Sequence, residues 1–162
     1  MSTYKYFIFS DTHGCYDFLM ESLTAAGFNI EDPSHILVGA GDYFDRGEQS
    51  EKLYKFFKSR KLKNRIYLVR GNHDDMLLDF LTGLDDGFFN AIYNGMSETI
   101  ESFSKLPLNL SMLQLDPNYY VDKIKENYPR LFKWLSTSLK RGFQIDNYKI
   151  THAGMSQDND GH

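Results

Sequence analysis

The 162-residue sequence has a single cysteine and no long apolar run. Because Cys15 has no second cysteine to pair with, no internal disulfide can form, which is typical of a reducing compartment. No apolar stretch approaches the ~18 residues of a membrane-spanning helix, and the polar start of the chain does not read as a signal peptide. We therefore expect a soluble, cytoplasmic protein that has no membrane partner.

The sequence also lacks a long basic run, and its formal net charge is -4. This balance argues against nucleic acid as the main partner. Residues 55–65 are basic, but Phe56, Phe57 and Leu62 interrupt them, so we interpret them as an exposed helix face with its following turn. With 41% hydrophobic and 25% charged residues the chain can bury a core, and residues 1–162 are predicted to form one domain.

Three short apolar runs each end in a loop that carries carboxylate, amide or imidazole side chains. The runs are residues 6–9, 36–38 and 66–69, and the loops that follow them are residues 10–14, 41–47 and 70–74. In open α/β sheets, ligand sites lie at the carboxyl ends of the strands. The sequence therefore predicts an α/β fold in which the three loops converge on one site.

Helical periodicity follows each of these loops. It begins after residue 14, covers residues 48–61 and resumes at residue 73. Strands separated by helices in this way are predicted to be parallel and joined by crossovers. Residues 88–139 then show no convincing strand, so we expect a helical insertion over about residues 75–140.

Two further signals lie inside and after the insertion. Asp116 followed by Pro117 predicts a helix that Asp116 caps. Residues 143–145 and 148–150 flank a two-residue turn and predict a hairpin. Its second arm runs into His152, so a fourth strand also ends in a side chain of the metal-binding type.

Five side chains at these strand ends are typical metal ligands. Asp11 and His13, two residues apart, lie on the same side of an extended segment. Asp42 can hold one ion on each carboxylate oxygen, Asn72 offers an amide oxygen and His152 an imidazole. This mixture suits Mn, Fe or Zn better than Ca or Mg. We expect two divalent ions about 3.5–4 Å apart, an arrangement that clamps both oxygens in phosphoryl displacement.

Four further side chains suit the hydrolysis of a phosphate ester. Arg46 and Arg70 border the ligand loops and can bind phosphate oxygens in a planar fork. His73 can protonate the leaving oxygen, and Asp45 can orient its imidazole. Taken singly, each residue could also be an ordinary turn residue, and either arginine could merely pair with a nearby aspartate. Four strand ends of this kind together favour metal-assisted phosphoester hydrolysis.

Four motifs carry a family resemblance. They are Ser-Asp-Thr-His-Gly at 10–14, Gly-Asp-Tyr-Phe-Asp-Arg-Gly at 41–47, Arg-Gly-Asn-His-Asp at 70–74 and His-Ala-Gly at 152–154. These motifs resemble those of the calcineurin-like metallophosphoesterases, and in detail the bacterial and phage serine/threonine phosphatase branch. Symmetrical diadenosine-tetraphosphate hydrolases carry similar motifs. The resemblance implies a sandwich of two mixed β-sheets flanked by helices and a two-metal site, often with Mn.

The resemblance also implies a role for each site residue. One metal would bind to Asp11 and His13, the other to Asn72 and His152, and Asp42 would bridge them. His73 and Asp45 would form the acid pair, and Arg46 and Arg70 would hold the phosphate.

The sequence departs from the family pattern after the His-Ala-Gly motif. Family members usually continue well beyond it, with a further histidine in a Gly-His loop and the rest of the second sheet, whereas here eight residues follow Gly154. Gly161-His162 repeats those letters only ten residues after His152, and we interpret this as chance. We therefore expect an incomplete shell around the second metal. An incomplete second sheet would expose an edge or apolar face, which favours a homodimer.

Three functions follow from these patterns. The first is metal-dependent hydrolysis of phosphate monoesters, of the serine/threonine phosphoprotein phosphatase type, by attack of a metal-bridging hydroxide. The second is hydrolysis of dinucleoside polyphosphates at the same site. The third is a truncated, catalytically weak remnant that binds metal or a partner.

Overall fold

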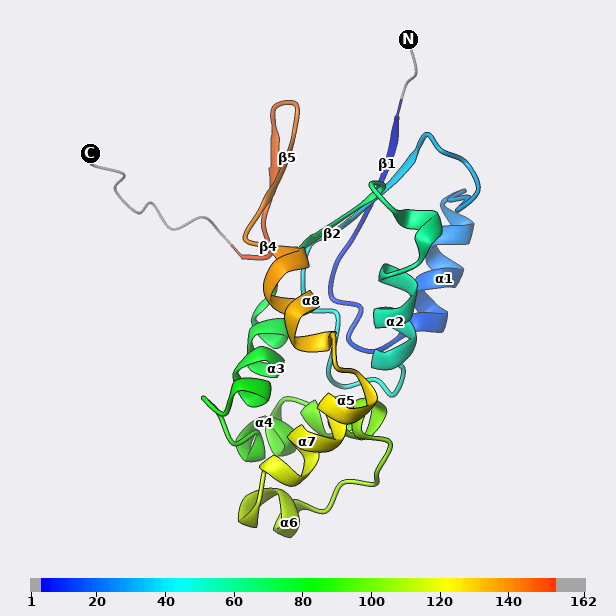
Figure 1. Cartoon of the computed structure of the whole chain (residues 1–162). Coiled ribbons are helices and arrows are strands. Elements are labelled where there is room, and N and C mark those ends of the chain that lie inside the picture. The colour runs from blue at the N-terminus through cyan, green and yellow to red at the C-terminus, as the bar shows by residue number, and fades with distance from the viewer. Residues whose placement is uncertain (1–3, 154–162) are drawn as a thin grey trace, which may run out of the picture.

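Short runs of aromatic and branched residues form one parallel sheet in the structure, a computed structural model that describes residues 4–153 (Figure 1). The strands are β1 (Lys5–Phe9), β2 (His35–Gly39), β3 (Ile66–Val69) and β4 (Leu139–Lys140), and they lie in that order. All three neighbouring pairs are parallel. The predicted α/β architecture is confirmed, and every strand of this sheet is parallel rather than mixed.

The two faces of the sheet differ in how well they are covered. Phe7 of β1 is buried, whereas its neighbour Ile8 is 58% exposed, as expected when successive side chains point to opposite faces. Ile8 is paired with Val38 and Val38 with Tyr67, so these three side chains share the second face. Tyr67 is also exposed, and Phe143 stacks on it, with 4.1 Å between the ring centroids. This face therefore retains exposed apolar side chains among the described residues.

Helices cover the other face and extend beyond it. α1 (Tyr16–Ala25) and α2 (Ser50–Phe57) lie on the side of the sheet away from the hairpin (Figure 1). The helix predicted over residues 48–61 is shorter than expected, because the backbone turns after Phe57 and a 3-10 turn, Arg60–Leu62, follows.

The predicted helical insertion is confirmed. Its helices are α3 (Asn72–Thr82), α4 (Phe88–Tyr93), α5 (Met96–Ser104), α6 (Leu110–Leu115), α7 (Asn118–Asn127) and α8 (Leu131–Ser138). In Figure 1, α4 to α7 form the end of the molecule below the strands. Buried apolar side chains of the sheet and of these helices belong to one core cluster.

Three details of the insertion differ from the sequence prediction. Asp116 does not cap α7: the cap residue is Pro117, which has no side-chain capping bond, and the helix begins one residue later. Helix α6 was not predicted, although Asn109 caps it by accepting a hydrogen bond from the Met112 N–H at 3.0 Å. Strand β4 was also missed, because a two-residue strand has no periodicity to detect.

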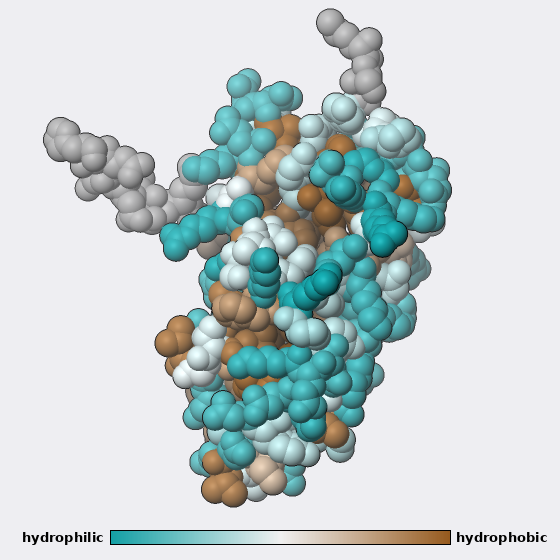
Figure 2. Space-filling model, viewed as in Figure 1, coloured by the Kyte–Doolittle hydropathy of each residue, from teal (hydrophilic) through white to brown (hydrophobic). Residues whose placement is uncertain are grey.

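The predicted hairpin is confirmed as β5 (Phe143–Ile145) and β6 (Tyr148–Ile150), which pair antiparallel. It forms the second sheet, two-stranded within residues 4–153. The same part of the chain contains no helix long and apolar enough to cross a membrane. Figure 2 shows a largely polar surface on which apolar side chains gather in patches, both beside the strands and over the helical end.

Glu51 connects α2 to the insertion. Its carboxylate accepts hydrogen bonds from Lys105 and Tyr128 and forms an ion pair with Lys55. Burial alone would raise the pKa of Glu51, but the bonds from Lys105, Lys55 and Tyr128 outweigh burial and lower the pKa to about 2. A carboxyl whose pKa falls on folding stabilises the folded state above its unfolded pKa, and that contribution is lost as pH falls towards 2.

We predict that Glu51→Gln lowers the free energy of unfolding at pH 7 by about 1–2 kcal/mol. The neutral amide cannot replace the carboxylate charge that binds Lys105, Lys55 and Tyr128, and the loss is limited because this position is partly solvated. The difference from the parent chain should shrink as pH is lowered from about 4.5 towards 2. Urea unfolding at pH 7 and at pH 3 measures both quantities. Glu21→Gln on the exposed surface of α1 is the matched control. An equal loss at both pH values would contradict the predicted linkage.

Candidate metal centre

The first two loops are joined along their backbones at the carboxyl ends of β1 and β2. The N–H groups of Asp11, His13 and Gly14 donate to the carbonyls of three consecutive residues that begin at Gly41, at 2.8–3.1 Å. The Asp42 loop is also anchored from below, since Tyr43 is fully buried and its hydroxyl donates to the Val69 carbonyl at 2.7 Å. Backbone hydrogen bonds therefore hold these two loops together without the help of the metal-ligand side chains.

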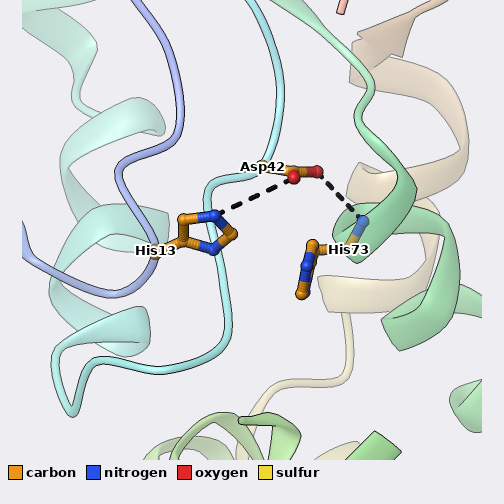
Figure 3. A group of neighbouring side chains, drawn as sticks. All are labelled: His13, Asp42 and His73. Atoms are coloured by element: carbon orange, nitrogen blue, oxygen red, sulfur yellow. Dashed lines mark hydrogen bonds and ion pairs between the residues drawn. The ribbon is translucent and has the colours of Figure 1, made fainter. Parts of the chain in front are cut away.

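Asp42 lies at the centre of the site, between the other two loops (Figure 3). Its carboxylate is nearly buried, and Oδ1 accepts a hydrogen bond from the His73 backbone N–H at 3.0 Å. Oδ2 lies 3.3 Å from His152 Nε2 and 3.9 Å from His13 Nε2. One carboxylate therefore faces imidazoles from two different loops.

Both imidazoles are oriented from behind by backbone carbonyls. His13 Nδ1 is 3.0 Å from the Phe44 carbonyl, and His152 Nδ1 is 2.9 Å from the Ala40 carbonyl. A carbonyl oxygen can only accept, so each Nδ1 carries the proton, and in the neutral ring Nε2 then presents a lone pair towards Asp42. Histidines that bind metals are held in this way. Two lone pairs facing a carboxylate repel it unless a cation or protons lie between them, so the donor set fits a divalent metal.

The candidate ligands form two groups that share Asp42. Within each group the ligand atoms lie within 4.8 Å of one another. One joins Asp42 to Asp11 and His152, and the other joins it to His13 and His73. The predicted amide ligand is also present, since Asn72 Oδ1 lies 3.2 Å from His152 Nε2. All five predicted ligands therefore converge. Their division between two ions stays a prediction.

His73 forms a second unit with two side chains of the Asp42 loop, the carboxylate of Asp45 and the guanidinium of Arg46. Its Nδ1 lies 2.8 Å from Asp45 Oδ2, and its Nε2 lies 3.4 Å from the terminal nitrogen of Arg46. The hydrogen bond to Asp45 raises the pKa of His73 against the effect of burial. Burial raises the pKa of Asp45, and the His73 bond opposes this. The pairing expected from the sequence is present and favours a protonated imidazole.

Backbone strain is concentrated in the site. Five of the eight non-glycine residues with positive φ among residues 4–153 belong to it, namely Asp11, His13, Asp42, Asp45 and Arg46. Such conformations cost roughly 1–3 kcal/mol each and persist only where the surroundings determine them. This distribution indicates that the loops are held for function, at a cost in stability.

Asp74 is a site residue that the sequence analysis missed as such. Its carboxylate is buried and accepts hydrogen bonds from the backbone N–H groups of Gly71, Asp42 and Tyr43, at 2.8–3.1 Å. Burial raises the pKa of Asp74 to about 7, although these N–H groups oppose the shift. The available signal was its place in the first turn of α3, where an acidic side chain reaches back to the cap. Asp74 joins the second loop to the third.

Arg70 is bonded to groups other than the predicted metal ligands. Its guanidinium pairs with Asp75 at 3.2 Å and donates to the Leu135 and Ser136 carbonyls at the end of α8. Arg70 nevertheless lines a cavity of about 760 Å³, which also contacts Asn72 and His152. Arg141 and Lys149 add two further positive charges to its wall.

A comparison with protein families identifies this arrangement. A family model for the calcineurin-like phosphoesterases matches residues 4–161. The chain belongs to the calcineurin-like phosphoesterase family. The resemblance found in the four sequence motifs is thereby confirmed, and the family normally uses a dinuclear centre of divalent metals.

Relatives of this chain include two kinds of tetraphosphatase. An asymmetrical bis(5'-nucleosyl)-tetraphosphatase PrpE of Halalkalibacterium halodurans is 27% identical over 95% of this chain and 58% of its own length. A symmetrical bis(5'-nucleosyl)-tetraphosphatase of Buchnera aphidicola subsp. Acyrthosiphon pisum is 41% identical over 53% of this chain and 29% of its own. The chain thus spans little more than half the length of the first relative and less of the second.

Solved structures agree on the fold. A candidate diadenosine tetraphosphatase superposes with a TM-score of 0.54 at 24% identity, covering 92% of this chain and 50% of that one. A protein serine/threonine phosphatase of Saccharomyces cerevisiae superposes with a TM-score of 0.57 at 22% identity, covering 98% of this chain and 40% of that one. Both structures share the fold of this chain.

We predict that Asp42→Asn lowers Mn affinity at least about tenfold or removes one bound ion, because an amide offers one neutral oxygen in place of two charged ones. Titration calorimetry of the metal-free protein with Mn measures both affinity and stoichiometry. Asp146→Asn in the hairpin turn is the control, since Asn tolerates the positive φ of that residue and the turn is outside the site. Unchanged Mn binding by Asp42→Asn would show that Asp42 is not a ligand.

Proposed function

We propose that this chain is a metal-dependent phosphoesterase. The observation that carries the proposal is the Asp42 carboxylate placed between the lone pairs of two carbonyl-anchored imidazoles, beside the His73–Asp45 pair. Asp11, His13, Asp42, Asn72 and His152 would hold the ions. Two divalent ions bound there would supply positive charge to the phosphate and activate water.

The remaining side chains would bind the negative charge of the phosphate and supply the proton for the leaving oxygen. Arg46 lies next to His73 Nε2, where its guanidinium can bind phosphate oxygens in a fork. His73 would donate its Nε2 proton to the leaving oxygen while Nδ1 stays bonded to Asp45. Because Asp45 raises the pKa of His73, the imidazole stays protonated at higher pH than a free histidine. Arg70 would contact phosphate only after releasing Asp75.

We propose dinucleoside polyphosphates, in preference to phosphoproteins, as the substrates. The sequence relatives are tetraphosphatases, whereas the likeness to a serine/threonine phosphatase at 22% identity supports only the fold. The basic cavity beside Asn72 also suits a substrate that carries negative charge beyond the phosphate at the metals. This reverses the order that the sequence motifs favoured. Mn as the metal, a cytoplasmic location and a homodimer stay predictions.

We predict Mn-dependent hydrolysis of an aryl phosphate by the parent chain, with kcat reduced about 10²–10⁴-fold in His73→Asn because the proton donor is lost. His35→Asn is the control, since His35 bonds to Asn29 and Asp32 outside the site and should affect stability rather than turnover. A chain that binds Mn but shows no turnover would contradict the proposal and favour the catalytically weak remnant. Relative kcat/KM for diadenosine tetraphosphate and for a phosphopeptide then decides the substrate class.

A further inference from the structure

The helical insertion reaches the Asp45–Arg46 turn directly. The Asp45 backbone N–H donates to the Thr99 hydroxyl of α5 at 2.7 Å. The next N–H, of Arg46, donates to the carbonyl of Gly95, the cap residue of α5, also at 2.7 Å. Both bonds connect residues about fifty positions apart in the sequence. The start of α5 therefore holds two consecutive N–H groups of the turn that carries the acid pair and the arginine.

The contact with Thr99 is sealed from water. Thr99, Asp45 and Ser50 are each fully buried. Ser50 Oγ lies 3.0 Å from Thr99 Oγ1, so each hydroxyl has a partner and the Thr99 oxygen remains available to the Asp45 N–H. No water can replace the threonine hydroxyl at a buried position of this kind without rearrangement.

The turn needs such support because of its backbone conformation. Asp45 and Arg46 have φ values of 70° and 66°, in the left-handed region that non-glycine residues rarely adopt. Gly95 is the residue that permits the close approach: a Cβ there would lie 2.7 Å from the Arg46 nitrogen, and Gly95 itself has φ of 75°. Both the glycine and the hydroxyl are thus required by geometry.

We propose that Thr99 and Gly95 are positioning residues that fix the Asp45–His73 pair and Arg46 for the phosphoesterase reaction. The inference rests on the proposed function for its catalytic consequence. The Asp45 carboxylate can meet His73 Nδ1 at 2.8 Å only while the turn keeps its φ values. Helix α5 of the insertion, together with its cap residue, therefore supports the side chains that would carry out the reaction.

Three variants on α5 test the role of the hydroxyl. Thr99→Val has the same shape but no acceptor, so the Asp45 N–H is left without a partner. Thr99→Ser keeps the hydroxyl and should behave like the parent. Ser102→Ala is the matched control, because Ser102 on the same helix accepts a bond from the Glu51 N–H, which is outside the turn.

The first readout is amide hydrogen exchange at Asp45, followed by NMR, which requires no catalytic activity. We expect exchange at Asp45 to be at least about tenfold faster in Thr99→Val than in the parent, and unchanged in Thr99→Ser and Ser102→Ala. Equal protection in Thr99→Val would overturn the proposal that Thr99 holds the turn. If Thr99→Val fails to fold, Gly95→Ala provides the same comparison at the Arg46 amide.

The second readout is Mn-dependent aryl phosphate hydrolysis. We expect kcat of Thr99→Val to fall about 10–100-fold with KM changed less than about threefold, because misplacement of the acid pair slows the chemical step. Thr99→Ser should recover most of this loss. Faster exchange with an unchanged kcat would reduce Thr99 to a structural residue and overturn the catalytic part. An inactive parent chain that still shows the exchange difference would overturn the proposed function while leaving the support of the turn intact.

Discussion

The arrangement of this protein depends on one carboxylate. Asp42 is buried at the end of β2, accepts a bond from the start of α3 and faces imidazoles from the first and last loops. Without positive charge among these groups, the lone pairs of His13 and His152 would oppose the carboxylate. This geometry fits a bound cation, and the positive φ values of its loops are the cost of bringing the donors together.

Two parts of the fold share the task of holding that geometry. The parallel sheet supplies the strand ends, and the buried carboxylate of Asp74 ties the second loop to the third through three backbone N–H groups. The helical insertion holds the opposite side, where Thr99 and Gly95 bind the Asp45–Arg46 turn. Its connection to α2 through Glu51 fixes that side to the layer that covers the sheet.

Much of this could be predicted from the sequence, because strand–loop–helix units and metal ligands have strong local patterns. Asp11, His13, Asp42, Asn72 and His152 follow apolar runs, and the predicted strands and insertion are present. Contacts between distant segments could not be predicted: nothing local marks Thr99 as the partner of Asp45, or directs Arg70 to the carbonyls at the end of α8. Strand β4 was missed for a different reason, since two residues show no periodicity, and α7 begins after Pro117 without the cap that Asp116 was predicted to provide.

The most direct test of the shared carboxylate is a crystal structure of this chain grown with Mn, with the ions located by their anomalous scattering. The two-metal centre that we propose predicts two peaks in contact with Asp42, and the family resemblance implies that one lies beside Asp11 and His13 and the other beside Asn72 and His152. Two peaks would establish the bridged centre. Ions bound elsewhere, with Asp42 accepting only backbone N–H groups, would contradict it.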